Sequence, residues 1–198
     1  MKNITMTKPA VFFISRITVR NLTFLPAIAA VLLAGFGCAS HPSQNSSAAP
    51  ENQPPPAKLA LKVVKVDSEE TVGEDGKAAN AVDGDTSTIW HTQWQDSNPP
   101  PPHEIVLELT PPATIKGFTY LPRQDDSENG MIKGYEFFVS HDGQDFGRPV
   151  AKGEFADGKD LKTVPFAPTP CRFVKLKALS EINGEAWSSA AEIGVVPE

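Results

Sequence analysis

The chain has 198 residues, a length that favours one folded domain. Lys and Arg number 18 and Asp and Glu number 24, so the formal net charge is −6 at pH 7. An acidic chain without a basic cluster argues against nucleic-acid binding and against adhesion to anionic lipid headgroups.

The first 37 residues are predicted to be an export signal. Their charged residues are all basic: Lys2, Lys8, Arg16 and Arg20. The uncharged run 21–37 follows, which is short for a membrane span of roughly 20 residues and ends in small residues before Cys38. Removal of the signal takes away four positive charges and changes the net charge from −6 to −10.

Residues 32–38 resemble a bacterial lipoprotein signal, in which the cysteine becomes the lipidated first residue of the mature protein. This resemblance implies lipidation at Cys38 and a membrane-anchored protein at the cell surface or in the periplasm. Gly35 and Phe36 depart from the usual signal, so ordinary secretion and an uncleaved anchor stay open. Cys171 is then expected to be a small buried residue, with a disulfide to Cys38 as the alternative.

Residues 38–58 are rich in Pro, Ser and Ala and hold almost no hydrophobic bulk. Such a segment cannot bury enough surface to offset its chain entropy, which predicts a disordered tether. The folded domain is expected over residues 59–198, and about 140 residues is enough for one well-filled core.

Short apolar runs separated by Gly, Pro and Asp turns fill residues 59–198. Strands are predicted at 61–66, 103–109, 115–121, 135–139, 172–179 and 190–196. Only residues 77–82 look briefly helical. Several short strands joined by turns indicate an all-β sandwich or barrel.

Oxygen-bearing side chains crowd a glycine turn near residue 84. Asp83, Asp85 and Thr88 lie around Gly84, and Ca²⁺ takes six to eight oxygen ligands in a flexible shell. The spacing and closing Glu of an EF-hand are missing. One loop supplies too few ligands, so a further one must come from elsewhere. The alternative is a Gly-Asp turn with solvated carboxylates.

Candidate ligand-binding residues follow this loop. Trp90 is expected in the core, and His91 then points the other way if the segment is extended. Arg123 and Asn129 belong to a loop that is too polar for the core. Trp187 lies in another polar loop, where it is either folded onto the core or held out as a stacking platform.

Taken together and in order, seven segments carry a family resemblance. They are Asp67–Thr71, Asp83–Trp94, Tyr120–Asp125, Asn129–Gly130, Tyr135–Gly143, Ala178–Gly184 and Ala190–Ile193. This set resembles the F5/8 type C (discoidin-like) family, and within it the family 32 carbohydrate-binding modules of bacterial sialidases and other glycosidases. The resemblance covers roughly residues 61–196. It implies a jelly-roll β-sandwich of the galactose-binding-like kind.

The resemblance also implies a structural calcium ion that ties the early loop to the C-terminal strand. Its ligands would be the carbonyl oxygens of Asn80 and Ala191 and the side chains of Asp83, Asp85, Thr88 and Glu192. Glu192 supplies the partner that the loop alone lacks. No open coordination position or catalytic water is implied.

Galactose-binding members of the family use a Glu, a His, an Arg, an Asn and an aromatic residue from neighbouring loops. In this sequence the resemblance places them at Glu70, His91, Arg123, Asn129 and Trp187. The axial 4-hydroxyl of a galacto sugar leaves one face of C–H groups free to stack on an indole, while the imidazole and guanidinium reach the 3- and 4-hydroxyls.

The leading hypothesis is a non-catalytic, monomeric, lipid-anchored module that binds terminal galactose or N-acetylgalactosamine on glycans. The alternative is a protein- or lipid-binding discoidin-like adhesin that has lost sugar binding. A glycosidase is not expected, because the adjacent carboxylates at 69–70 and 125–126 diverge instead of flanking a bond.

Overall fold

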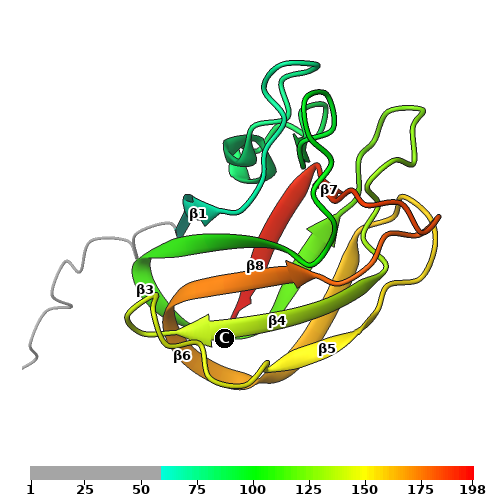
Figure 1. The fold of residues 1–198 in the computed structure, drawn as a ribbon. Helices are drawn as coiled ribbons and strands as arrows, with labels where there is room; N and C mark the ends of the chain where they lie inside the picture. Colours follow the sequence, from blue (N-terminus) through cyan, green and yellow to red (C-terminus); the bar gives the residue numbers. More distant parts are fainter. Residues whose placement is uncertain (1–58) are drawn as a thin grey trace, which may run out of the picture. The chain divides into compact units, whose positions relative to one another are not determined.

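The computed structural model describes residues 59–198. The predicted signal, the lipidation site at Cys38 and the tether lie outside this range. The described residues form an all-β fold, as predicted from the strand pattern and the family resemblance (Figure 1). Within this part of the chain, no helix has the length and apolar character needed to cross a membrane.

Eight strands and one short 3₁₀ helix make up the fold. They are β1 (Ala60–Val66), η1 (Ala78–Val82), β2 (Trp90–His91), β3 (His103–Leu121), β4 (Gly134–Ser140), β5 (Ala151–Glu154), β6 (Lys162–Ala178), β7 (Ser189–Ala190) and β8 (Glu192–Pro197). The brief helix expected at 77–82 is therefore present as η1.

Two long strands build both layers of the sandwich. The first half of β3 pairs with β1 and with the second half of β6, whereas its second half pairs with β8 and with the first half of β6. Strands β4 and β5 extend the first layer beyond β6, in the order β1-β3-β6-β4-β5. Register shifts between Glu108 and Ala113, and between Ile115 and Gly117, mark where β3 passes from one layer to the other.

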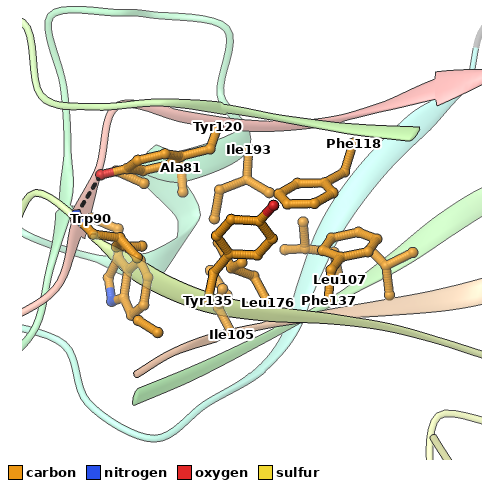
Figure 2. Packing of buried hydrophobic residues seen from close by; sticks show 14 of the residues in the cluster. Ala81, Trp90, Ile105, Leu107, Phe118, Tyr120, Tyr135, Phe137, Leu176 and Ile193 are labelled. Atoms are coloured by element: carbon orange, nitrogen blue, oxygen red, sulfur yellow. Dashed lines mark hydrogen bonds between the residues drawn. The ribbon is translucent and has the colours of Figure 1, made fainter. Parts of the chain in front are cut away.

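The core lies between these two layers. Figure 2 shows Phe118, Tyr120 and Ile193 on one side, facing Tyr135 and Phe137 on the other. The rings of Phe118 and Phe137 stack with centroids 4.0 Å apart. Full burial of each such side chain stabilises the fold by about 1.5–3 kcal/mol. The core is thus aromatic across its middle, and it fixes the relative position of the two layers.

Trp90 and Cys171 belong to this core, as the sequence predicted. Trp90 is fully buried, and its indole Nε1 donates to the carbonyl of Ser68 at 2.9 Å. Cys171 is a buried free cysteine. The two-residue strands β2 and β7 pair beside the core and bring His91 opposite Ser189. This small sheet anchors the loops that follow His91 and precede Ser189.

Candidate functional site

A pocket of about 200 Å³ opens where four loops meet. The loops follow β1, β2 and β3 and precede β7; the first of them rises from one end of the strands in Figure 1. The pocket is lined by Glu74, His91, Trp94, Arg123, Ser127, Asn129 and Trp187. Four of the five residues predicted to bind sugar, all except Glu70, are therefore brought together.

His91 lines the pocket, and its ring is held in one tautomer. Its ring is 2% exposed, and Nδ1 lies 2.7 Å from the carbonyl oxygen of Thr92. A carbonyl only accepts, so Nδ1 carries the proton of the neutral ring and Nε2 keeps its lone pair. Burial is the main cause that lowers the pKa of His91, and the positive charge of Arg123 lowers it further. The ring is therefore neutral at neutral pH.

Arg123 is held rigidly with part of its guanidinium unused. Nε and Nη2 donate to the two carboxylate oxygens of Asp125, at 2.7 and 2.6 Å, and Nη1 donates to the carbonyl of Asn129 at 3.0 Å. These bonds use three of the five guanidinium N–H groups. The side chain is nearly buried, so the two remaining donors are fixed in position before any ligand arrives.

Trp94 provides the exposed aromatic surface of the pocket. It is 38% exposed, and its indole Nε1 donates to Glu74 Oε1 at 2.9 Å. Its ring lies directly over Gly73, where an added Cβ would come within 2.6 Å of the indole. A glycine is therefore needed beneath the ring, and Glu74 fixes the rotation of that ring.

Trp187 forms a second aromatic wall. It is half-buried, and its ring centroid lies 6.2 Å from that of His91 at an interplanar angle of 48°. Its indole Nε1 is buried without a hydrogen-bond partner among residues 59–198. The structure thus gives Trp187 both roles that the sequence left open, since it packs inward and also lines the pocket.

Glu70 does not reach the pocket, contrary to the expectation from the sequence. Its side chain is fully buried, and its carboxylate accepts four backbone N–H bonds. Oε1 accepts from Val72 and Gly73 at 2.7 and 2.9 Å, and Oε2 accepts from Trp94 and Gln95 at 2.8 Å each. The bond from Trp94 is the largest cause that lowers the pKa of Glu70 to about 2, against the opposing effect of burial.

Glu74 stands where the sugar-binding carboxylate was expected. The alternation of an extended run could have shown that Glu70 is not the pocket carboxylate, because Ser68 and Glu70 point inward while Glu69 points out. Glu74 instead precedes a Gly-containing turn beyond that extended run. Trp94 and Ser127 are further lining residues outside the predicted set, and Trp94 was identifiable as an aromatic three positions after His91.

The predicted calcium ligands converge only in part. No group of three or more His, Cys, Asp or Glu side chains at metal-binding spacing is present in residues 59–198. Glu192 nevertheless reaches the loop from β8, since Gly84 N donates to its Oε1 at 2.7 Å. Burial is the main cause that raises the pKa of Glu192, and the negative charges of Asp83 and Asp85 raise it further. A like charge beside a carboxylate disfavours its ionised form.

Backbone and hydroxyl groups hold the same loop in shape. The Asp83 carboxylate accepts from Asp85 N at 2.8 Å and from Thr88 Oγ1 at 2.9 Å. Asn80 Nδ2 donates to the carbonyls of Asp75 and Ile89. The oxygen-rich donor set fits a hard cation such as Ca²⁺, which Asp83, Asp85 and Glu192 would hold together with the predicted oxygens of Asn80, Thr88 and Ala191.

Comparison with known proteins identifies the family to which this sequence is similar. The family model described as F5/8 type C domain matches residues 64–193. The sialidase of Micromonospora viridifaciens is 39% identical over 136 residues, which are 68% of this chain and 21% of the sialidase. The galactose oxidase of Gibberella zeae is 38% identical over 133 residues, which are 67% of this chain and 19% of the oxidase. The chain thus spans about a fifth of the length of these curated relatives.

Solved structures give the same result at the level of the fold. The module CpGH89CBM32-5 from Clostridium perfringens, solved in complex with GalNAc-β-1,3-galactose, is 40% identical with a TM-score of 0.63; the match covers 69% of this chain and 94% of the module. The family 32 module of NanJ from C. perfringens, solved with galactose, is 27% identical with a TM-score of 0.58; here the match covers 69% and 92%. On its sequence and its fold, the chain belongs to the F5/8 type C domain family, with family 32 carbohydrate-binding modules among its structural relatives.

Proposed function

We propose that residues 59–198 bind one terminal galactose or N-acetylgalactosamine residue of a glycan and catalyse no reaction. The observation that carries this proposal is the pocket itself. It brings together His91, whose Nε2 keeps its lone pair, Arg123, whose donors are prepositioned, and the exposed ring of Trp94.

The polar groups of the pocket suit the hydroxyls of a galacto sugar, and its aromatic ring suits the C–H face of that sugar. A hydroxyl can donate to one group and accept from another, so one sugar hydroxyl can bond to His91 and Arg123 at the same time. Glu74 and Asn129 add a carboxylate and an amide to the same pocket. The axial 4-hydroxyl leaves the opposite C–H face free to stack on Trp94, as apolar faces do on an indole.

The comparisons support this sugar class. The relatives from C. perfringens were solved with galactose, with GalNAc-β-1,3-galactose and, for two modules of ZmpB, with GalNAc. All of these ligands contain the axial 4-hydroxyl on which the proposed recognition depends.

Catalysis is not part of the proposal, because the pocket lacks a pair of free carboxylates. Glycoside hydrolysis uses two carboxylates on opposite sides of the scissile bond. Glu74 is the carboxylate that lines the pocket in residues 59–198. Asp125 is engaged by Arg123 and Glu70 by four backbone N–H groups.

Binding is expected to be weak. A pocket of about 200 Å³ is smaller than the roughly 300–1,000 Å³ of drug-sized sites, which favours a single sugar. At about −0.3 kcal/mol per heavy atom, the roughly twelve heavy atoms of galactose give about −3.6 kcal/mol, which is a dissociation constant of about 2 mM. Many copies on one membrane would add avidity.

The experiment is a titration of the protein with galactose, N-acetylgalactosamine and glucose, followed by tryptophan fluorescence. We expect a saturable change for the two galacto sugars and a much weaker one for glucose. Arg123→Lys removes the fixed fork of donors and should weaken binding at least tenfold. Arg172→Lys is the matched control, because Arg172 pairs with Glu108 on the surface. Equal affinity in both variants would contradict the assignment.

Two further proposals concern the setting of this module. Cys38 is proposed as the lipidated residue of an exported, membrane-anchored protein, which rests on the signal-like residues 1–37. A calcium ion is proposed between η1 and β8 with a structural role. Its support is the oxygen-rich donor set and the negative charges of Asp83 and Asp85 beside Glu192, which raise the pKa of the Glu192 carboxyl.

A further inference from the structure

His103 is a fully buried histidine with an acceptor at each ring nitrogen. It is the first residue of β3, and its Nδ1 lies 2.8 Å from Asp67 Oδ2. Its Nε2 lies 2.9 Å from the carbonyl oxygen of Ala186. An ionised carboxylate and a carbonyl both accept hydrogen bonds and donate none.

This pair of contacts defines the protonation state of the ring. A neutral imidazole has one N–H, so one of its nitrogens would direct a lone pair at an oxygen. The imidazolium has two N–H groups and satisfies both contacts. Asp67 is itself fixed, because its Oδ1 accepts from Glu104 N at 2.7 Å and its backbone N donates to Glu104 O at 3.1 Å.

Ala186 immediately precedes Trp187, the inner aromatic wall of the pocket. We propose that the imidazolium of His103, oriented by Asp67, is a positioning group that holds the loop before β7 and thereby sets Trp187 in its place in the pocket. The link from Trp187 to sugar affinity rests on the proposed function. The link from His103 to the loop does not.

The surroundings of the ring favour its charged form. Burial, the largest single effect, acts to lower the pKa of His103, but the bond and charge of Asp67 and the Ala186 carbonyl together raise it above 6.5. The segment before β3 contributes the Pro99 carbonyl, which also raises the pKa. Across β6 the register partner is Ala178, which carries no charge.

The sign of the pH effect follows from this direction. Because the pKa is raised on folding, the stabilisation is fully present below about pH 6.5. It is lost as the pH rises through the pKa of the folded state. Above the pKa of the folded state the ring keeps one N–H. Either the bond to the Ala186 carbonyl or the bond to Asp67 is then lost. Trp187 is then held less firmly.

The test is an NMR titration of the ¹⁵N-labelled protein from pH 5 to 10. The chain has four histidines and three tryptophans, so the ring nitrogens of His103 and the indole of Trp187 can be assigned by substitution. We expect both ring nitrogens of His103 to be protonated at pH 6 and the ring to titrate above pH 6.5. The indole signal of Trp187 should change with the same midpoint, while that of the core residue Trp90 stays constant.

Two variants make the result decisive. Asp67→Asn removes the charge that favours the imidazolium, so it should move the midpoints of both His103 and Trp187 to lower pH. His103→Gln cannot titrate, so it should abolish the alkaline change at Trp187. A His103 ring that is already neutral at pH 6, or a Trp187 signal that does not change with the His103 titration, would overturn the proposal.

Sugar affinity provides a separate readout. Loss of the hydrogen bond that holds the loop is expected to weaken galactose binding about fivefold as the pH rises through the His103 midpoint. If galactose is not bound at any pH while the two NMR midpoints still coincide, the sugar proposal fails and the positioning role of His103 stands.

Discussion

Glu70 and Glu74 lie four residues apart and both carry a carboxylate, yet one is buried in the fold and the other lines the pocket. The Glu70 carboxylate is buried and fully engaged by backbone N–H groups, whereas Glu74 accepts from Trp94 and keeps a face toward the pocket. The role of each glutamate is therefore decided by the groups around its carboxylate. Glu70 points inward from an extended run, whereas Glu74 lies beyond that run.

His91 makes the clearest prediction at the scale of one residue. Burial lowers its pKa below 6.5, so the neutral ring persists to mildly acidic pH. Below that pKa, Nε2 gains a proton and no longer accepts from a sugar hydroxyl. Galactose affinity, measured by the fluorescence titration, should fall as the pH is lowered through the pKa of His91. Affinity that stays constant while the His91 ring gains its second proton, followed by NMR in the folded domain, would contradict the role of His91 as acceptor.

The sequence predicted much of the site because its residue types are chemically distinctive. His91, Arg123, Asn129 and Trp187 meet in the pocket as expected. Glu70 does not, because the backbone N–H groups that engage it come from residues 72–73 and 94–95, and that contact exists only after folding. Distinctive side chains are visible in a sequence, whereas their backbone partners are not.

At the scale of elements, Glu70 joins two loops that together present Glu74 and Trp94. Gln at this position has one acceptor oxygen, and its amide would face two N–H donors. Glu70→Gln should therefore destabilise the domain by about 3–5 kcal/mol in denaturant unfolding. Glu69→Gln is the control, because within residues 59–198 Glu69 accepts from Ala78 N alone, at 2.8 Å, and Gln retains an acceptor. Equal stability of the two variants would refute this role.

Glu70 also gives a pH dependence of known sign. Its folded pKa of about 2 lies below the usual 4.5, so its stabilisation is present above about pH 4.5. It is lost as the pH falls toward 2. The free energy of unfolding should decline over this acid range in the parent chain. The decline should be smaller in Glu70→Gln.

The calcium proposal also belongs to the scale of elements, because the ion would tie the η1 loop to β8. Adding calcium should raise the melting temperature, with about 2.7 kcal/mol of stabilisation at one hundred times the dissociation constant. Glu192→Gln removes one carboxylate and should abolish most of that gain. Glu198→Gln, at the chain end beyond β8, is a matched control. An unchanged melting temperature with calcium and with chelator would exclude a structural ion.

The strand pattern predicted the fold class but not the extent of the strands. Strands β3 and β6 each continue through segments that contain prolines, which were expected to end them. The short edge strand β5 lacks alternating apolar residues, so it was missed. The predicted run 190–196 is divided into β7 and β8 at Ala191. Pairing partners, which the local sequence does not reveal, decide these boundaries.

At the scale of the whole molecule, the chain combines a family fold with a signal-like first segment. We predict that a Cys38→Ser variant, expressed in a bacterium, loses the incorporation of a labelled fatty acid that the parent chain shows. Equal labelling of both would exclude lipidation at Cys38. The anchored parent should retain galactose-coated beads better than the soluble variant, because many weak sites act together.

The most direct measurement for sugar binding is an NMR titration of the three indole N–H signals with galactose. Trp90 is buried in the core and bonded to Ser68, so it serves as an internal reference. We predict large saturable shifts for Trp94, smaller ones for Trp187, and none for Trp90. Glucose at the same concentration should produce little change. No shift at Trp94 with saturating galactose and N-acetylgalactosamine, in the folded protein, would contradict a sugar site in this pocket.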